Sequence, residues 1–438
     1  MNIEVELLGE HEVKSRELNI GLKDSKGGIK SFKTPAYFPT IARYGDLRDI
    51  MDAKVRLEQM GVPDNLPYIK GVVIEAHSIP TVLTKQLQLT QQMRLWSRDK
   101  GDGFANFYDY LHEYGLVFVV DPNLDRIQIA QTYGKDFQRL NQEYAELGKE
   151  FFTKDILNRM TKHEPIDARL FLNPDFITRV IKLQHRYMAD VILPPYAEIN
   201  LRTFTSDLAT NLELFAATSQ INKYIFKNEK PVIPVICLHN NVFKAKSGPT
   251  GRKEWDALID AFVKLDADMI ILKITNFNTS SKDESYREIF SFFKQLRAAT
   301  TKPILFLNIN EFAYVLLREG LDIYASRMSR SGMDVPIKPL ERPPRHGKYY
   351  VPRKMELKKF EDIKELPCDC PFCTVYPKGA HRGLSANDWN SIRIYHFVYT
   401  KDKELELLMA EMKKNSLRAA LRDIYADSEN WKNFTEFI

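Results

Sequence analysis

The sequence is poor in cysteine and lacks long apolar runs. Only 4 of its 438 residues are cysteines, which excludes the disulfide framework of a small secreted protein. No run reaches the roughly 18 apolar residues of a membrane-spanning helix. Residues Met1–Glu6 have neither the basic nor the apolar region of a signal peptide. These absences predict a cytoplasmic protein with no membrane partner.

Internal repeats, low-complexity tracts and a glycine-rich phosphate loop are also absent from the sequence. The formal net charge is only +5, and 44% of the residues are hydrophobic and 28% charged, as in ordinary soluble globular proteins. The mild positive charge permits a nucleic-acid partner but does not demand one, because the distribution of charge matters more than its total.

Three of the four cysteines lie close together. Cys368, Cys370 and Cys373 form a C-x-C-x2-C pattern, and His396 follows downstream. Three thiolates and an imidazole are the tetrahedral ligands typical of structural Zn2+. His381 is the alternative fourth ligand, but His396 is expected because a zinc loop usually takes its last ligand from a separate element. Four protein ligands leave no open position, so we expect a structural metal and a catalytic site elsewhere.

Short apolar runs rich in β-branched residues recur between amphipathic segments. The runs cover residues 71–76, 116–121, 189–194, 231–238, 267–274, 303–309 and 320–325, preceded by an extended segment at 33–42. Such runs are typical of strands buried on both faces, and the segments 176–185 and 255–263 are predicted helices. The alternation predicts an α/β fold with parallel pairing, a (β/α)8 TIM barrel, with an open doubly wound sheet as the alternative.

The pattern divides the chain into two parts. Residues 1–336 are predicted to form the barrel, with a helical insertion at about 122–168, and residues 337–438 a basic loop, an inserted zinc-binding subdomain and closing C-terminal helices. Candidate nucleic-acid contacts in the loop are Arg342, Arg345, Lys348, Arg353 and Lys354. With Tyr349 and Tyr350 the loop suits phosphate contact and base stacking. A solvated linker is the alternative interpretation.

Four features occur in one order along the chain: Thr34–Pro39, Asn173–Asp175, Gly320–Tyr324 and the cysteine–histidine cluster. In this order they resemble the tRNA-guanine transglycosylase superfamily, from about residue 18 to the C-terminus. The resemblance implies a (β/α)8 barrel with a zinc subdomain that exchanges a guanine in a nucleic acid for a 7-deazaguanine base. Members act on tRNA and a paralogous branch acts on DNA, so both polymers remain candidate partners.

Base exchange with retained configuration requires a nucleophile, most simply a carboxylate, and a second group that moves protons. Asp121 ends an apolar strand, where barrels present catalytic groups, and the resemblance places the family's general acid/base there. A turn cap before Pro122 is the alternative role for this aspartate. The family's Gly-Gly-Phe-Gln loop is replaced here by residues 122–126.

The position of the family's nucleophilic aspartate is Ala325 in this chain. Alanine cannot attack a sugar carbon. Asp322 is the candidate substitute, although a regular strand turns positions 322 and 325 to opposite faces and a bulge would be needed. Asp334 and Ser326 are further alternatives.

The positions that recognise the base also differ from the family. Tyr196 replaces an aspartate that binds the guanine edge, and Glu198, two residues on, could accept from the base's N–H groups. His239 and Asn240 replace a Gln-Gly pair. These four residues are the predicted substrate-binding set, with ordinary loop roles as the alternative.

Two functions of different class follow. The first is a divergent pentosyltransferase that inserts a 7-deazaguanine base into DNA or tRNA, and it would have to extrude the base from a duplex. The second is a catalytically inactive nucleic-acid-binding subunit, because of Ala325, that pairs with an active relative or another enzyme. A protein partner or a homodimer thus stays open, as does a sugar-phosphate enzyme on the same barrel.

Overall fold

The structure is a computed structural model that describes most of the chain. It covers residues 3–10, 16–23, 28–41, 61, 68–76, 115–125, 127, 151–162, 164–244, 249–276, 285–328, 347–364, 366, 368–374, 380–412 and 417–435. Within these residues the strands form three sheets, of three, seven and two strands. Among the helices described there, none combines the length and apolar character needed to cross a bilayer.

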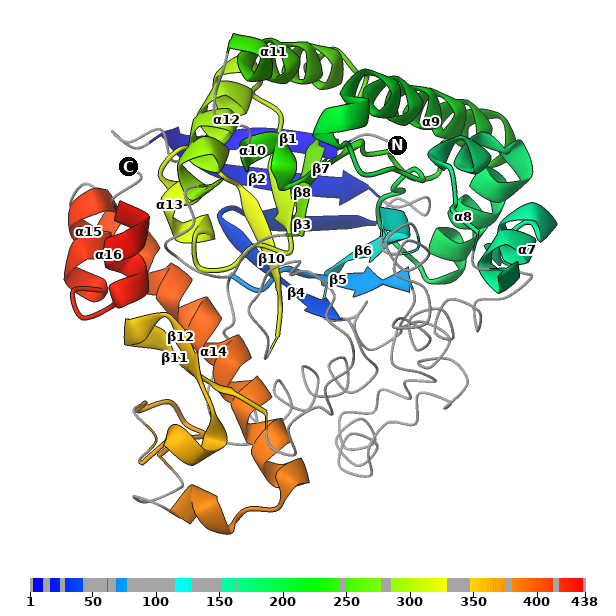
Figure 1. Ribbon diagram of the computed structural model, residues 1–438. Coiled ribbons are helices and arrows are strands. Elements are labelled where there is room, and N and C mark those ends of the chain that lie inside the picture. Colours follow the sequence, from blue (N-terminus) through cyan, green and yellow to red (C-terminus); the bar gives the residue numbers. More distant parts are fainter. Residues whose placement is uncertain are drawn as a thin grey trace.

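The seven-stranded sheet is the centre of the fold, which is of the α/β class. Its strands are β4 (Ala36–Ile41), β5 (Gly71–Glu75), β6 (Val117–Asp121), β7 (Val235–His239), β8 (Ile270–Thr275), β9 (Ile304–Leu307) and β10 (Ile323–Arg327). They are all parallel, in the order β6-β5-β4-β10-β9-β8-β7. The sheet curls into a half-barrel surrounded by helices (Figure 1). Parallel strands at the predicted apolar runs are thereby confirmed.

The predicted strand at 189–194 is the exception, because it is an extended connection and not a regular strand. The Asp190 N–H donates to the Phe118 carbonyl oxygen of β6 at 2.8 Å. Ile192 and Ile199 form isolated parallel bridges on the side of β7. Pro194 lies between these bridges and has no N–H to donate, which interrupts a continuous ladder. Residues 190–199 therefore lie between the two edge strands of the sheet.

An antiparallel sheet that the sequence did not reveal covers the amino-terminal edge of these strands. It consists of β1 (Ile3–Glu10), β2 (Arg16–Lys23) and β3 (Ile29–Lys33). The Ile3 N–H donates to Asp268, just before β8, and Arg16 forms an ion pair with Asp322, just before β10. Apolar residues of β1–β3 pack in one cluster with the inward-facing residues of the parallel strands. The carboxyl-terminal edge is the opposite end of the same interior.

Helices pack on the outside of the parallel sheet. They are α7 (Lys154–Lys162), α8 (Pro174–Arg186), α9 (Phe204–Ile225), α10 (Asn241–Lys244), α11 (Pro249–Val263), α12 (Ser285–Ala299) and α13 (Ala313–Leu317). In α8 the Asn173 side chain caps the first turn by accepting the Asp175 and Phe176 N–H groups. Phe176, Ile177 and Val180 are buried on its inner face. The predicted helices at 176–185 and 255–263 are confirmed.

The C-terminal part packs against this outer layer. It contains the hairpin β11 (Tyr349–Val351) and β12 (Glu356–Lys358), then α14 (Ala386–Met412), α15 (Leu417–Ile424) and α16 (Glu429–Thr435). Figure 1 shows α14 running beside the hairpin, with α15 and α16 at one end. The stacking role predicted for Tyr349 and Tyr350 is wrong. Both are at most 1% exposed, because their hairpin lies against α14.

A buried polar cluster joins α14 to the rest of the molecule. The Lys401 ammonium donates to Glu311 at 2.9 Å and to the Tyr350 hydroxyl at 2.8 Å. Glu404 accepts from the hydroxyls of Tyr314, Tyr350 and Tyr425 at 2.7 to 3.1 Å. Charges at this depth are tolerated because each is paired and hydrogen-bonded. The cluster thus fixes α14 against both α13 and the hairpin.

Asp402 of α14 makes stability depend on pH. Its Oδ1 accepts the backbone N–H groups of Tyr68 and Ile69 at 2.7 and 3.1 Å, but burial outweighs them and raises its pKa to about 7. The folded state therefore binds this proton more tightly than the unfolded state. We expect the stability from this group to be fully present below about pH 4 and lost as the pH rises to 7, by at most about 4 kcal/mol.

Urea unfolding of wild type and Asp402→Asn between pH 4 and 8 measures this effect. The asparagine oxygen can still accept both N–H groups, so the variant should show a flatter pH dependence. The exposed Asp423→Asn is the matched control and should leave the slope unchanged. Identical slopes for wild type and Asp402→Asn would contradict the prediction.

Candidate functional site

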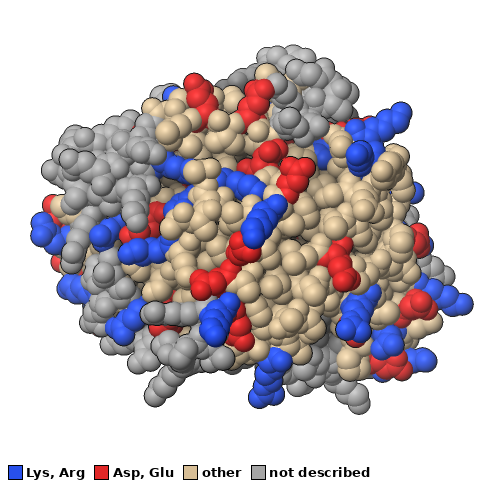
Figure 2. Space-filling model, turned by 90° about the horizontal axis from the view of Figure 1, so that it is seen from above, with Lys and Arg blue, Asp and Glu red and all other residues tan. Residues whose placement is uncertain are grey.

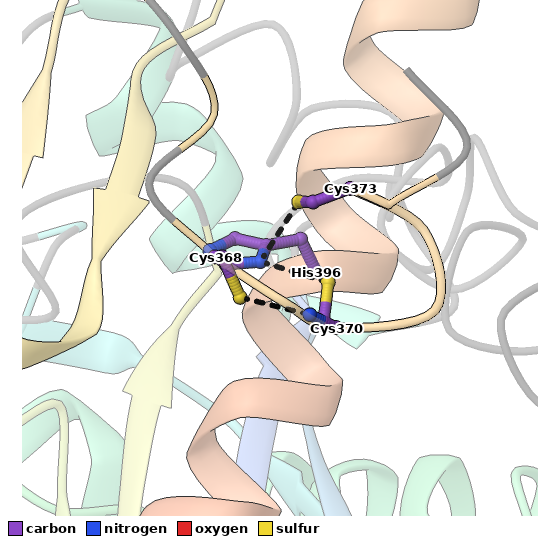
Figure 3. Close-up of side chains that lie close together, drawn as sticks. All are labelled: Cys368, Cys370, Cys373 and His396. Carbon is purple, nitrogen blue, oxygen red and sulfur yellow. Dashed lines mark hydrogen bonds between the residues drawn. The ribbon is translucent and has the colours of Figure 1, made fainter. Parts of the chain in front are cut away.

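The cysteines and histidine predicted from the sequence meet at one point. The ligand atoms of Cys368, Cys370, Cys373 and His396 all lie within 4.8 Å of one another (Figure 3). His396 Nδ1 is 3.4 Å from Cys370 Sγ and 3.5 Å from Cys373 Sγ. A tetrahedral zinc ion with ordinary Zn–S and Zn–N bonds separates such atoms by about 3.6 Å. The donor set and its spacing therefore fit a metal such as zinc.

The surroundings of the cluster orient His396. Its Nε2 lies 2.7 Å from the Tyr350 carbonyl oxygen, which can only accept, so Nε2 carries the proton and Nδ1 keeps its lone pair for a metal. The Tyr349 hydroxyl lies 3.0 Å from Cys373 Sγ. Burial and the neighbouring Cys373 raise the pKa of Tyr349, which keeps it a neutral phenol able to donate to a metal-bound Cys373 thiolate. The Cys370 N–H donates to Cys368 Sγ at 3.3 Å.

His381, the alternative ligand, is not part of the cluster formed by the described residues. Its Nε2 is 3.2 Å from the Ile363 carbonyl oxygen, and its ring packs against Phe360 and Trp389. His396 of α14, the residue expected as the fourth ligand, lies with the three cysteines, on an element separate from their loop.

The structure describes three of the five basic residues predicted to contact nucleic acid. Lys348, Arg353 and Lys354 are exposed beside the hairpin, whereas Arg342 and Arg345 lie outside the described residues. On the face shown in Figure 2, Lys and Arg side chains are interspersed with Asp and Glu. The described residues of that face therefore form no patch of only positive or only negative side chains.

Asp121 lies inside the sheet at the carboxyl end of β6, as its position in the sequence predicted. Val117 and Val119 face the interior, so the two-residue alternation of the strand turns Asp121 inward too. Its side chain is 1% exposed. The Tyr196 hydroxyl donates to Asp121 Oδ1 at 2.5 Å. Burial and the nearby carboxylates of Asp121 and Asp125 raise the pKa of Tyr196 well above 10, so Tyr196 remains a neutral donor.

Lys273 of β8 completes this cluster, and sequence reasoning missed it. Its ammonium lies 3.3 Å from Asp121 Oδ2, 2.8 Å from Asp125 Oδ1, 2.5 Å from Asn123 Oδ1 and 3.0 Å from the Tyr196 hydroxyl. The Lys273 side chain is fully buried. The available signal was a lysine inside the apolar run 267–274, because a strand buried on both faces carries a charge only when it is paired.

The other predicted substrate-binding residues lie at the same edge of the sheet. Glu198 is half-buried and accepts from the Thr275 hydroxyl, two residues after Lys273 on β8. His239 ends β7, and its Nε2 is 3.0 Å from Asn276 Nδ2. Asn240 is 1% exposed, yet within the described part of the chain neither polar atom of its side chain has a hydrogen-bond partner. The Tyr196 hydroxyl is hydrogen-bonded to Asp121 and to Lys273.

The two predicted catalytic aspartates do not share a site. Asp322 precedes β10 at the amino-terminal edge, where Arg16 and Arg297 form ion pairs with it and the Ile304 N–H donates to it. Asp121 ends β6 at the opposite edge of the same parallel sheet. Asp322 is fully buried beneath these partners. It therefore stabilises the amino-terminal edge and does not form the predicted catalytic pair with Asp121.

The structure also describes the position of the family's nucleophile and one of its two other candidate substitutes. Ala325 faces the interior beside Phe38 of β4, in the apolar cluster. Ser326 faces outward, where its hydroxyl meets that of Tyr37 at 3.0 Å. Asp334 lies outside the described residues. A second buried pair, Glu75 with Arg327, spans the ends of β5 and β10 and was not expected from the sequence.

Comparison with known proteins adds little to this geometry. No family model matches the chain, and no curated protein matches it. One similar solved structure is described as "a putative phosphonomutase from Burkholderia cenocepacia J2315". It is 13% identical over 67% of this chain and 86% of that chain, with a TM-score of 0.31. A likeness at that level carries no functional argument.

Proposed function

We propose that this chain is a base-exchange transglycosylase that replaces a guanine of DNA or tRNA with a 7-deazaguanine base. The observation that carries the proposal is the cluster of Asp121, Asp125, Tyr196 and Lys273 at the carboxyl edge of the parallel strands, where α/β barrels hold their active sites. The proposal takes the sheet as a (β/α)8 barrel in which residues 190–199 occupy the place of the remaining strand.

Asp121 is the proposed proton donor and acceptor for the departing and arriving bases. The Tyr196 hydroxyl and the Lys273 ammonium fix the orientation of its carboxylate. Glu198 would accept hydrogen bonds from the N–H groups of guanine, since an ionised carboxylate only accepts. His239 and the unsatisfied amide of Asn240 would contact the same base, because a buried amide without a partner is stabilised when a ligand supplies one.

The metal cluster has a separate role in this proposal. Cys368, Cys370, Cys373 and His396 would hold zinc as a closed, four-ligand structural site that leaves no position for a substrate. Lys348, Arg353 and Lys354 would contact phosphates of the nucleic acid, which fixes the position of the polymer but not its sequence preference.

Mass spectrometry of nucleosides tests the proposal. The full chain is incubated with a DNA duplex or with tRNA, together with a 7-deazaguanine base, and the digested polymer is then analysed. We expect the new nucleoside in one polymer and release of an equal amount of guanine. No exchange into either polymer would contradict the proposal.

A second function, a catalytically inactive nucleic-acid-binding subunit, is favoured by one observation. Ala325 stands where the family resemblance places the nucleophile, and its neighbour across the β4–β10 ladder is Phe38. Binding to both polymers without exchange, at a level unaffected by Asp121→Asn, would support this alternative.

A further inference from the structure

We propose that Lys273 is the nucleophile of the base exchange, an inference that rests on the proposed function. In this reaction its amine would form a transient covalent bond with C1′ of the sugar. Amines of buried lysines serve as covalent nucleophiles where a neighbouring group removes their proton.

The register of the sheet places Lys273 level with the missing nucleophile. On β8 it pairs with Leu307 of β9, and on β10 the pairing of Tyr324 with Phe306 puts Ala325 beside the same leucine. Lys273 and Ala325 thus stand at equivalent positions of the hydrogen-bonded register, on two strands separated by β9. Ala325 and Leu307 are both apolar and at most 1% exposed. A side chain that can act as a nucleophile is therefore present two strands away from Ala325.

The groups around Lys273 can take up its proton. The ammonium contacts two carboxylates, Asp121 and Asp125, so the three groups carry three charges with a net charge of −1 when all are ionised. Transfer of one proton from Lys273 to Asp121 keeps that net charge but leaves only one charged group. The transfer yields a neutral amine, the form in which a lysine can attack a carbon atom.

The steps balance without an oxidant or a reductant. The Lys273 amine attacks C1′, the bond from C1′ to the guanine nitrogen breaks, and that nitrogen keeps the electron pair and takes the proton from Asp121. The resulting secondary ammonium returns a proton to the Asp121 carboxylate. The nitrogen lone pair then forms a C1′=N iminium as the bond from C1′ to the ring oxygen breaks, and the ring oxygen keeps that electron pair and takes the proton back from Asp121. The incoming base reverses these steps, and two displacements at C1′ retain the configuration.

Borohydride trapping tests this inference on the full chain. The protein is mixed with a guanine-containing DNA duplex or tRNA, without added base, and treated with sodium borohydride, which reduces an iminium to a stable amine. We expect a covalent protein–nucleic acid adduct, mapped by peptide mass spectrometry to Lys273. Lys401, equally buried and also paired with carboxylates, is the internal control and should carry no adduct.

Substitution provides the second measurement. Lys273→Arg keeps a cation against Asp121 and Asp125 but removes the nucleophile, so the exchange rate should fall by at least about a thousandfold. Lys30→Arg changes a lysine that pairs with Asp190 at the amino-terminal edge and should keep the wild-type rate. If Lys273→Arg does not fold, as judged by circular dichroism, the mapped adduct of the wild type decides.

The possible outcomes separate the inference from the proposed function. Exchange with an adduct on Lys273 supports both. Exchange without any adduct, or with an active Lys273→Arg, overturns the inference and leaves the proposed function standing. An adduct on Lys273 without exchange supports the nucleophile but overturns base exchange. Neither exchange nor adduct overturns both.

Discussion

Cys370→Ala is expected to bind no zinc, whereas the wild type is expected to bind one ion per chain. Loss of one thiolate leaves three ligands and opens the closed tetrahedron. A metal present at a thousandfold its dissociation constant contributes about 4 kcal/mol to stability, so the variant should unfold at lower temperature. Inductively coupled plasma mass spectrometry gives the zinc content, and thermal denaturation gives the stability. Chelation of the wild type should reproduce the variant.

Two matched controls come from the same chain. Cys237→Ala removes the one cysteine of the sequence outside the cluster, a buried residue of β7, and should keep one zinc per chain. His381→Ala should also keep it, whereas His396→Ala should not. Retention of zinc in Cys370→Ala, or its loss in His381→Ala alone, would show that the ligand set is wrong.

Asp121→Asn is expected to lower the exchange rate by about a hundredfold to ten-thousandfold, the usual contribution of a general acid/base. Asparagine is close in shape and can still accept the Tyr196 hydroxyl, but it cannot take or return a proton. Lys273 keeps Asp125 as a partner, so the fold should survive. Single-turnover exchange measures the rate, and circular dichroism verifies the fold.

Asp322→Asn is the corresponding control at the other edge of the sheet. It weakens the ion pairs with Arg16 and Arg297, so the unfolding temperature should fall while the exchange rate of the folded protein stays unchanged. An inactive but folded Asp322→Asn, together with an active Asp121→Asn, would reverse the assignment of the two aspartates.

The parallel strands were predictable because a strand buried on both faces must be nearly all apolar. β5, β6, β8 and β9 all show this, with every residue buried. β1–β3 were missed because one side of that sheet is exposed, so Leu7 and Ile29 lie among charged residues. The segment at 189–194 was wrongly predicted as a strand because its composition is apolar, whereas Pro194, which has no N–H, prevents a continuous ladder.

The metal cluster was predictable because its ligands are identified by residue type and spacing. The cluster of Asp121, Tyr196 and Lys273 was only half predictable. Asp121 ends a strand and is visible in the sequence, but its contacts with Tyr196 and Lys273 join residues more than seventy positions apart. Asp322 was misplaced for a related reason: residue type suggested chemistry, whereas the direction of β10 puts that aspartate at the far edge.

Helix α14 connects several separate parts of the molecule. Its 27 residues include His396, which lies with the three cysteines, and Lys401 and Glu404 of the buried polar cluster. They also include Asp402, which accepts from the backbone that leads into β5. His396 and Asp402 are about 9 Å apart along the helix axis. The helix therefore connects the cluster of Cys368, Cys370, Cys373 and His396 to the backbone that leads into β5, and a metal held by that cluster would fix one end of this connection.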